Sequence, residues 1–458
     1  MQAIVCGAGQ VGFNIARELA TESIGVTVID MRAELIQKLS DSLDVKAMVG
    51  HASEPDVLEA AGAADTDMII AVTYADEVNM VACQVAHSLF DVPTKIARVR
   101  ARSYLNPLWS DLFRRDHMPI DVIISPEKEV ARAIGRRLTV PGAFDVIPVA
   151  SDRLRLIGVR CTETCPVVNT PLRQLTTLFP DLNIVVVGIR RDDRPIVPHG
   201  DDQMLNGDDV YFVVDSNQVG RAMAAFGHEE PEARRIVVIG GGNIGLQLAE
   251  DIEAAEEGGR VRLIELDKER AEFVAQNCAR TIVLHGDALD PEILDESGVS
   301  RSDTIVAVTD DDEVNILASL LAKRAGAQRA VTLVNKATYA PLMRPLGIDV
   351  VVDPRAITVS TILQHIRRGR IHSVHSIGED FGEIIEAEAL ETSSLVNVPL
   401  REARLPPGVV VAAVVHEGRV DMARGSTTLK VGDRVVLFAT KEAIKKVERL
   451  FAVRLEFF

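Results

Sequence analysis

The sequence predicts an α/β fold that occurs twice: two doubly wound parallel sheets, each followed by a small α+β domain. Two observations support this prediction. Short apolar runs alternate with helical patterns over residues 1–140, and the same succession returns from 235 onward. In addition, a glycine-rich loop of the pattern GxGxxG directly follows the first apolar run of each half.

An internal repeat fixes the domain organisation. The run IVCGAGQVGFNIA at 4–16 matches VVIGGGNIGLQLA at 237–249, and the offset between matching runs stays at 233 to 236 residues over the whole section. A different section also repeats, because GDDVYFVV at 207–214 matches GDRVVLFA at 432–439. We therefore expect four domains, at residues 1–140, 141–228, 232–370 and 371–458.

The parallel sheet follows from the apolar runs of the first half. Near-continuous apolar strands separated by helices are typical of a sheet covered on both faces, and right-handed crossovers make it doubly wound. A helix at 129–138 and its counterpart at 357–368 are placed to lead out of each sheet. The strands are expected at 3–6, 26–29, 46–49, 68–72, 95–99 and 121–124.

The smaller sections, 151–220 and 376–450, have a different character. They contain short β-rich runs joined by Gly-Asp turns, with few and short helices, which predicts small α+β domains. Their turn acids are expected to be solvated rather than to bind an ion, namely Asp201, Asp202, Asp208 and Asp209.

Composition and charge exclude several classes of protein. The net charge is −17 and no long basic run is present, which argues against nucleic acid as a partner. The longest apolar runs are far shorter than the ~20 residues that a membrane-spanning helix needs. The first residues show no pattern of a signal peptide. We therefore expect a chain that does not cross a bilayer by itself.

The five cysteines are sparse and odd in number, which suits a reducing cytosol. Cys161 and Cys165 are separated by three residues, but no second pair follows at a spacing typical of zinc sites. Ordinary buried thiols are therefore expected, and no metal site is predicted.

The first glycine loop predicts a phosphate site. Gly7 permits the tight turn, Gly9 lets the backbone approach a pyrophosphate, and Gly12 allows close packing of helix on strand. The following helix offers free N–H groups to the phosphate. Asp30 ends the next strand, where its carboxylate can accept hydrogen bonds from ribose hydroxyls and would repel a 2′-phosphate. The loop comprises Gly7, Ala8, Gly9, Gln10, Val11 and Gly12.

The second half keeps the same features. Its acid is Glu265, at the position that corresponds to Asp30. The alternative is a duplicate that keeps the turn and has lost the ligand, but retention of the glycines and the acid favours a second site. Its candidate binding residues are Gly240, Gly242, Asn243, Ile244 and Glu265.

The pattern AVTxxDEVN follows the fourth strand in both halves, at the carboxyl edge of the sheet where ligands bind. Its threonine could donate a hydroxyl there, while its acid suits the helix dipole, so capping and ligand binding are both open. The candidates are Thr73, Glu77 and Asn79 in the first half, and Thr309 and Glu313 in the second.

The residues after the third strand are expected to flank an adenine or ribose. They are His51 and Ala52 in the first half, and Asp287 and Ala288 in the second. His51 is better interpreted as a polar loop residue than as a catalyst.

Arginines end the fifth strand of the first half. Alternation places Arg98 and Arg100 on one face, and arginine at a carboxyl-edge loop is suited to phosphate, although surface ion pairing is the alternative. In the second half, Asn335 and Lys336 stand roughly where Arg100 and Ala101 stand in the first. The two sites should therefore differ in affinity or in ligand.

The sequence offers no proton donor in a pattern shared by the halves, and no GxxxxGK[ST] loop. Nucleotide sites without such groups favour a sensor, in which the ligand biases a conformation. An NAD-dependent oxidoreductase and a nucleotide sensor without a membrane partner are the alternatives.

Together these motifs, with IARVR at 96–100, resemble the family of RCK, or KTN, domains that regulate potassium transport. The resemblance implies a non-enzymatic regulator that binds NAD(H) and also ATP or ADP. It further implies a peripheral position on the cytosolic face of a potassium-translocating membrane subunit, and a homo-tetramer whose ring holds eight RCK units. The family's binding roles carry over to Gly7, Gly9, Asp30, Arg98, Arg100, Gly240, Gly242 and Glu265.

The acid at the end of the second strand yields a first prediction. We expect tighter binding of NADH than of NADPH, and weaker binding of NADH by Asp30→Ala, because the carboxylate accepts from ribose hydroxyls and repels a 2′-phosphate. Isothermal calorimetry with both dinucleotides measures the preference. Equal affinities would refute the role given to Asp30.

Overall fold

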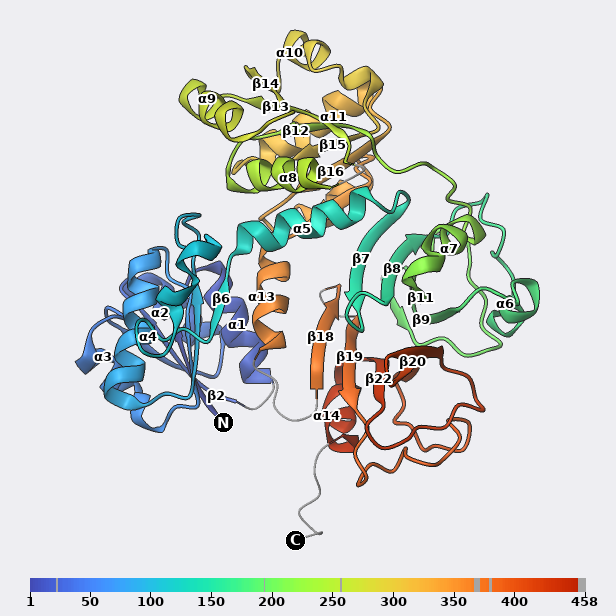
Figure 1. The fold of residues 1–458 in the computed structure, drawn as a ribbon, viewed down its shortest axis with the longest axis horizontal. Coiled ribbons are helices and arrows are strands. Elements are labelled where there is room, and N and C mark those ends of the chain that lie inside the picture. Colours follow the sequence, from blue (N-terminus) through green and yellow to red (C-terminus); the bar gives the residue numbers. More distant parts are fainter. Residues whose placement is uncertain (22–23, 193, 256–257, 366–370, 379–380, 452–458) are drawn as a thin grey trace. The chain divides into compact units, whose positions relative to one another are not determined.

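The computed structural model describes residues 1–458 except 22–23, 193, 256–257, 366–370, 379–380 and 452–458 (Figure 1). The chain forms two compact units. The first comprises Met1–Val130 with Asp353–Ile366, and the second comprises Ala131–Val352 with Arg367–Phe458.

The first unit is built on a parallel sheet of six strands in the order β3-β2-β1-β4-β5-β6. The order reverses between β1 and β4, which is the switch point where doubly wound sheets bind ligands. All the pairings are parallel, as the near-continuous apolar strands predict. The strands are β1 (Gln2–Cys6), β2 (Gly25–Asp30), β3 (Lys46–Val49), β4 (Met68–Ala71), β5 (Thr94–Arg98) and β6 (Val122–Ile124).

Helices cover both faces of this sheet because successive side chains of a strand point to opposite sides. In β1, Val5 packs with residues of α1 and α2, whereas Ile4 and Cys6 pack with residues of α3 and α4. The helices are α1 (Gln10–Thr21), α2 (Ala33–Ser42), α3 (Pro55–Ala61), η1 (Ala63–Asp65), α4 (Asp76–Phe90), η2 (Pro107–Phe113) and α5 (Pro126–Leu138), whose last residues belong to the second unit.

A helix from the second half of the sequence completes the first unit. The helix α13 (Pro354–Gln364) packs against α1, and its Ile362 and Leu363 side chains are buried in the same apolar cluster as Ile15 and Leu19. The repeat pattern predicts this helix but contains no information about which sheet its apolar face covers.

The second unit contains the repeat of the parallel sheet, in the order β14-β13-β12-β15-β16-β17. Its strands are β12 (Arg235–Ile239), β13 (Arg260–Glu265), β14 (Ile282–His285), β15 (Thr304–Ala307), β16 (Arg329–Leu333) and β17 (Val350–Val352). Its helices are α8 (Asn243–Ala254), α9 (Lys268–Asn277), α10 (Pro291–Glu296), η4 (Val299–Arg301), α11 (Asp312–Ala325) and α12 (Ala340–Met343).

The second unit also contains two antiparallel sheets with five strands each. The first has the order β10-β9-β11-β8-β7, and the second has the order β18-β19-β22-β20-β21. The elements of the first are β7 (Ala143–Val149), β8 (Leu154–Arg160), α6 (Leu172–Leu178), β9 (Ile184–Arg191), β10 (Arg194–Ile196), β11 (Asp209–Asp215), η3 (Ser216–Gln218) and α7 (Val219–Ala225). Those of the second are β18 (Ile371–Ile377), β19 (Gly382–Glu388), β20 (Val409–His416), β21 (Arg419–Met422), β22 (Arg434–Ala439) and α14 (Lys441–Leu450).

Aromatic rings join the two antiparallel sheets. The Tyr211 ring stacks on Phe381 with 5.1 Å between the ring centroids, and Phe438 lies 5.3 Å beyond Phe381. The close approach needs a glycine, because a Cβ on Gly188 would lie 2.3 Å from the Phe381 ring. The two small domains therefore share one apolar cluster, as such ring stacking stabilises packing beyond the area it buries.

The predicted fold class is confirmed: two parallel sheets, each accompanied by an antiparallel one. Within the described part of the chain, no helix has both the length and the apolar character needed to cross a membrane.

One expectation about the turn acids was wrong. Asp208 and Asp209 are almost completely buried, at 1% and 3% exposure, whereas Asp201 and Asp202 are not. The buried carboxylates are paired with arginines: Asp208 with Arg191 at 2.8 Å, and Asp209 with Arg160 at 2.6 Å. Buried charges need such partners, and the arginines lie on strands far from the turn in sequence.

The position of α13 leads to a prediction. Leu363→Ala, in the second half of the sequence, should destabilise the first unit by about 2–5 kcal/mol, because it leaves a cavity in that unit's core. Hydrogen–deuterium exchange of the full chain should show lost protection in peptides from β1 and α1, and unchanged protection in β12 and β13. The exposed Leu342→Ala on α12 is the control, and equal loss in both parallel sheets would contradict the packing of α13.

Candidate functional site

The first glycine loop has the backbone geometry that a phosphate site needs. Gly7 has a φ of +111°, which favours glycine. A Cβ on Gly12 would lie 1.8 Å from the carbonyl oxygen of Gly7, so any larger residue would push α1 away from the loop. A Cβ on Gly9 would meet nothing within 4 Å, which leaves its backbone open to a ligand.

The second glycine loop repeats each of these features. Gly240 has a φ of +102°, and a Cβ on Gly245 would lie 1.9 Å from the Gly240 oxygen. A Cβ on Gly242 again meets nothing within 4 Å. The helices α1 and α8 begin at Gln10 and Asn243, so their first N–H groups point at the open side of each loop. Val11 and Ile244 lie in the same first turns.

The acids at the ends of β2 and β13 lie against the glycine loops. Asp30 Oδ2 accepts a hydrogen bond of 2.7 Å from the Ala8 N–H, and Glu265 Oε2 accepts one of 2.6 Å from the Gly241 N–H. A carboxylate in this place is positioned beside a bound ribose. The longer Glu265 side chain reaches the same loop atom as Asp30, so the two carboxylates are interchangeable in geometry.

A buried asparagine organises the loop after β4. Asn79 is fully buried, and its Oδ1 accepts hydrogen bonds from the N–H and hydroxyl of Thr73, at 2.8 and 2.7 Å. Its Nδ2 donates to the carbonyl oxygens of Thr73 and Arg98, at 3.2 and 2.9 Å. Thr73 in turn lies against Gly7. Asn79 therefore positions the loops around the site, and its amide has its hydrogen-bonding groups engaged within the protein.

The second half contains the same arrangement with matching distances. Asn315 Oδ1 accepts from the N–H and hydroxyl of Thr309 at 2.8 and 2.7 Å, and its Nδ2 donates to the carbonyl oxygens of Thr309 and Leu333. Thr309 lies against Gly240.

Sequence reasoning missed an acid that shapes both sites. Asp76 Oδ2 accepts hydrogen bonds from the N–H groups of Arg100 and Ala101, at 2.9 and 2.7 Å. Asp312 does the same in the second half, accepting from Asn335 and Lys336 at 2.8 and 2.7 Å. The sequence did contain a signal for this acid, because the DEVN pattern shared by the halves begins with Asp76 and with Asp312. Its role depends on a loop that is distant in sequence.

The first site contains an arginine whose hydrogen-bonding capacity is incompletely used. Arg98 is half-buried, and its Nε has no hydrogen-bond partner among the described residues. The same holds for the buried atoms Asp76 Oδ1 and Glu127 Oε2. Burial lowers the pKa of Arg98, while the nearby Glu127 carboxylate acts in the opposite direction. Unpartnered buried polar atoms are costly, so their concentration here points to a polar ligand or ordered water.

Arg100 lies two residues after Arg98 and is likewise half-buried. Its guanidinium stacks over the Tyr74 ring at 4.2 Å and donates to the Tyr74 carbonyl oxygen. The Tyr74 side chain is 82% exposed, which makes it available for stacking.

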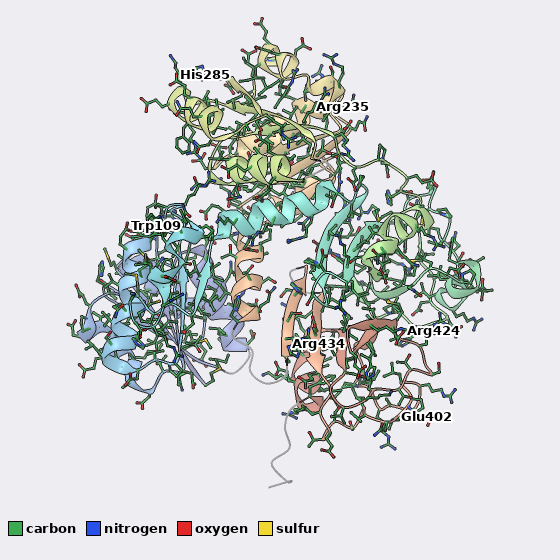
Figure 2. The ribbon with its side chains drawn as sticks, in the orientation of Figure 1. Trp109, Arg235, His285, Glu402, Arg424 and Arg434 are labelled. Atoms are coloured by element: carbon green, nitrogen blue, oxygen red, sulfur yellow. The ribbon has the colours of Figure 1, made fainter. Side chains whose placement is uncertain are left out.

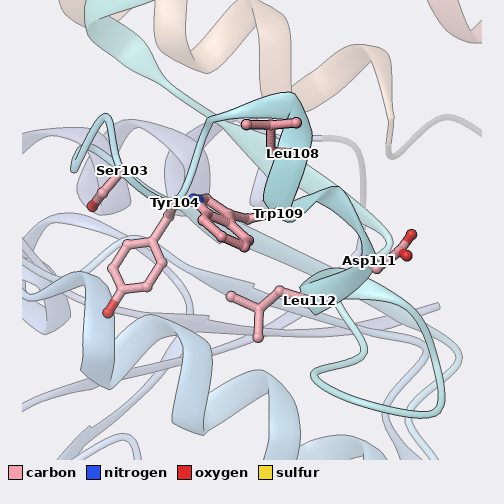
Figure 3. Close-up of a pocket in the computed structure, with 6 residues that line it drawn as sticks. All are labelled: Ser103, Tyr104, Leu108, Trp109, Asp111 and Leu112. Atoms are coloured by element: carbon pink, nitrogen blue, oxygen red, sulfur yellow. The ribbon is translucent and has the colours of Figure 1, made fainter.

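A pocket of about 420 Å³ lies around η2, the short helix that follows Arg100 in the sequence (Figure 3). In that view the side chains of Tyr104, Trp109 and Leu112 lie together, while Asp111 points away from them.

The second site presents different side chains. The Glu313 carboxylate accepts hydrogen bonds from Lys336 Nζ and the Tyr339 hydroxyl, both at 2.7 Å, and these contacts lower the pKa of Glu313 to about 2. Glu77, its counterpart, is exposed like Glu313, but Ala101 stands where the second half has Lys336. A second difference is Arg270, which donates from Nε to the Gly241 carbonyl oxygen at 2.6 Å. Leu35 occupies the corresponding place in the first half.

The residues after the third strands are less engaged. His51 Nδ1 and the Ser53 hydroxyl are 2.7 Å apart, and Ala52 is buried. In the second half, Asp287 Oδ1 accepts from the Leu289 N–H at 2.8 Å, and Ala288 is buried. The His51 and Asp287 side chains therefore stabilise the turns in which they lie.

Comparison with known proteins places this geometry in a family. The family described as the TrkA-N domain matches residues 3–126 and 236–354, and the family described as the TrkA-C domain matches residues 156–227 and 384–452.

Relatives of full length are similar over the whole chain. A Trk system potassium uptake protein TrkA of Azorhizobium caulinodans is 53% identical over 458 residues, covering 100% of both chains. One of Halomonas elongata is 40% identical over 462 residues, with the same coverage. A solved structure titled "GsuK channel bound to NAD" has a TM-score of 0.60 at 20% identity, covering 99% of this chain and 79% of that one. It shares the fold.

The glycines allow a sharp test of the loop geometry. Gly9→Ala should leave folding intact and weaken nucleotide binding at least tenfold, because its methyl group enters open space beside the loop. Gly12→Ala should instead lower the thermal unfolding midpoint, since its Cβ collides with a carbonyl oxygen. Differential scanning calorimetry and nucleotide titration distinguish the two. Unchanged binding by the Gly9→Ala chain would place the ligand elsewhere.

Proposed function

The chain belongs to the family of Trk system potassium uptake proteins TrkA, and from that premise we propose that it is the nucleotide-responsive regulatory subunit of a potassium uptake system. The residues predicted to bind the nucleotide at the two parallel sheets are proposed as its sites. The observation that supports the proposal is the arrangement of the first glycine loop, the Asp30 carboxylate and the partly unsatisfied Arg98 around the switch point of one sheet.

NAD(H), ATP and ADP are the proposed ligands. A solved structure of the similar GsuK channel is bound to NAD, and the open space beside Gly9 and Gly242 suits a phosphate chain at both loops. Arg98 and Arg100 add two positive charges at the first site, where Arg100 lies 3.8 Å from the Asp76 carboxylate and Arg98 Nε has no described partner. This charge would favour a ligand with more phosphate charge there. The second site offers Lys336, which is already paired with Glu313. This site would therefore favour a ligand with less phosphate charge.

The proposed mechanism is a shift between conformations. A ligand can bias an equilibrium only by its difference in affinity for the two states, at about 1.4 kcal/mol for each factor of ten. A phosphate that pairs with Arg98 would satisfy Nε and would favour the conformation in which the loops after β4 and β5 converge. Exchange for a ligand with fewer phosphates would release that conformation and so change the assembly.

Exposed apolar side chains support the proposed homo-oligomer. In the first unit they include Tyr74, Val81 and Leu108, together with Trp109, labelled in Figure 2. In the second parallel domain Leu317, which corresponds to Val81, is exposed as well. Contiguous apolar patches mark interaction surfaces, and we propose that these side chains contribute to one. We propose a tetramer that contributes eight RCK units to a ring.

The proposed partner is a TrkH- or TrkG-like potassium-translocating subunit, bound at the cytoplasmic face of the inner membrane. Co-expression with such a subunit should give co-purification and rubidium influx that depends on nucleotide. Influx that is unaffected by this chain would overturn the proposal. Sustained NADH oxidation with a small carbonyl substrate would support the oxidoreductase alternative instead.

Arg100→Ala should weaken ATP binding at the first site about tenfold or more and leave the second site unchanged, because a charge-assisted hydrogen bond contributes about 1.5–3 kcal/mol. Lys336→Ala is the matched variant at the second site. Calorimetric titration that resolves the two classes of site measures both. If Arg100→Ala weakened both classes equally, its side chain would act at a subunit interface and not on the phosphate.

A further inference from the structure

A segment of the second parallel domain is attached to the first antiparallel domain at both of its ends. The segment runs from Arg329, the first residue of β16, to Arg344, directly after α12, and we call it the bridging segment. The Arg329 guanidinium donates hydrogen bonds to the carbonyl oxygens of Arg137, at 3.1 Å, and of Ala143 at the start of β7. The Arg344 guanidinium donates to Asp209 Oδ2 at 2.6 Å.

The middle of the bridging segment is held by the first turn of α11, next to the proposed second nucleotide site. Asp312 accepts hydrogen bonds from the N–H groups of Asn335 and Lys336, at 2.8 and 2.7 Å. Glu313 accepts from Lys336 Nζ and from the Tyr339 hydroxyl, both at 2.7 Å. Lys336 and Tyr339 thus bind one exposed carboxylate, and a phosphate that pairs with Lys336 must compete with Glu313 for it.

The helix α12 is held by a small apolar cluster of its own. Met343 is buried there with Val334 and Ile348, and the partly buried side chains of Ile316 and Leu320 from α11 pack against them. This cluster is separate from the one that joins α10 and α11 to the second parallel sheet. A segment with few buried apolar contacts shifts at a low cost in free energy. The helix can therefore move while the main core of its domain stays packed.

Asp209 can lose Arg344 without becoming an unpaired buried charge. Arg160 of β8 donates to Asp209 Oδ1 from Nε and Nη2, at 3.0 and 2.6 Å, and Arg190 Nε of β9 lies 3.8 Å from Oδ2. Both arginines belong to the same antiparallel domain as Asp209 and would remain beside it. The Arg344 side chain is 58% exposed, so water can hydrate its guanidinium after release. The large penalty for breaking a buried ion pair, which comes from the charge left behind, is therefore avoided.

The fold of the small domain does not require an acid at position 209. Arg434 begins β22 in the second antiparallel domain as Asp209 begins β11 in the first, and the matching runs GDDVYFVV and GDRVVLFA align the two. Arg434 pairs with Glu386 at 3.2 Å. The carboxylate of Asp209 is therefore explained by the arginines that it binds, one of which comes from the bridging segment.

We propose that the bridging segment couples the second nucleotide site to the first antiparallel domain, and that ligand binding releases Arg344 from Asp209. The inference rests on the proposed function, because it needs a phosphate-bearing ligand at the second glycine loop. A phosphate that pairs with Lys336 takes this side chain from Glu313, and the loop before α12 loses one of its anchors. The helix then shifts, and Arg344 at its C-terminal end leaves the Asp209 carboxylate.

Thermodynamic linkage gives this coupling a definite sign. The contact between Arg344 and Asp209 stabilises the ligand-free conformation, so its loss counts against the binding free energy of the ligand. Removing the arginine in advance takes away that penalty, and the affinity of the second site for its ligand rises. A contact that only stabilised the fold would not have this effect on affinity.

The test is a calorimetric titration of the full-length chain with ATP, in which the second site is the class of site that Lys336→Ala weakens. We expect Arg344→Ala to bind ATP at this class at least about fivefold more tightly than the unmodified chain. Arg190→Ala is the matched control, because it removes a guanidinium that lies beside the same carboxylate but outside the bridging segment. It should leave the affinity of this class unchanged. Circular dichroism checks that both variants are folded.

Hydrogen–deuterium exchange follows the movement itself. ATP should lower the protection of peptides that cover α12 in the unmodified chain, and Arg344→Ala should show the lowered protection already without ATP. Peptides that cover β12 and β13 should keep their protection in both chains, since the main core of the domain stays packed.

The possible failures are distinguishable. Unchanged or weaker ATP binding by Arg344→Ala, or an equal gain in Arg190→Ala, would overturn the coupling and leave the second nucleotide site standing. If no class of ATP site were weakened by Lys336→Ala, the proposed second site itself would be refuted, and the coupling with it.

Discussion

One buried amide in each parallel sheet fixes the geometry on which the proposed sites depend. Asn79 lies completely inside the protein and joins Thr73 after β4 to the Arg98 carbonyl oxygen at the end of β5. An unpaired amide there would cost about 1–3 kcal/mol, so the two loops are held together strongly. Because Thr73 also touches Gly7, the phosphate loop takes its position from the same contact. The loops are therefore arranged by the protein's own hydrogen bonds.

The sequence was sufficient to predict the parts of this arrangement that follow from local rules. Apolar periodicity predicted the strands, and the glycines predicted the loops because their backbone demands are local, as Gly7 and Gly12 show. The position of Asp30 beside the loop was also predictable, since this residue ends the strand next to the loop. The sequence likewise marked Asn79 and Arg98, but not the contact between them.

Features that depend on distant contacts were not predictable in this way. Asp76 acts on the backbone of residues 100 and 101, and nothing near Asp76 in the sequence indicates that loop. Asp208 and Asp209 read as solvated turn acids because the arginines that neutralise them come from other strands. The packing of α13 on α1 depends on tertiary structure, which a repeat pattern does not reveal.

The duplication has conserved the scaffold and changed the side chains that it presents. Asn315 and Asp312 reproduce the hydrogen bonds of their counterparts to within a few tenths of an ångström. By contrast, Leu333 stands where the first half has Arg98. Selection for one ligand at two equal sites would preserve that charge. Its loss within an unchanged scaffold argues that the two sites serve different ligands or different affinities.

The chain passes between the two units through short connections. Only Asp353 separates β17 from α13, and its carboxylate caps that helix by accepting from the N–H groups of Arg355 and Ala356. Only Ser125 separates β6 from α5, which continues into the second unit. A joint of one residue next to a capped helix leaves little slack for the chain to absorb a displacement.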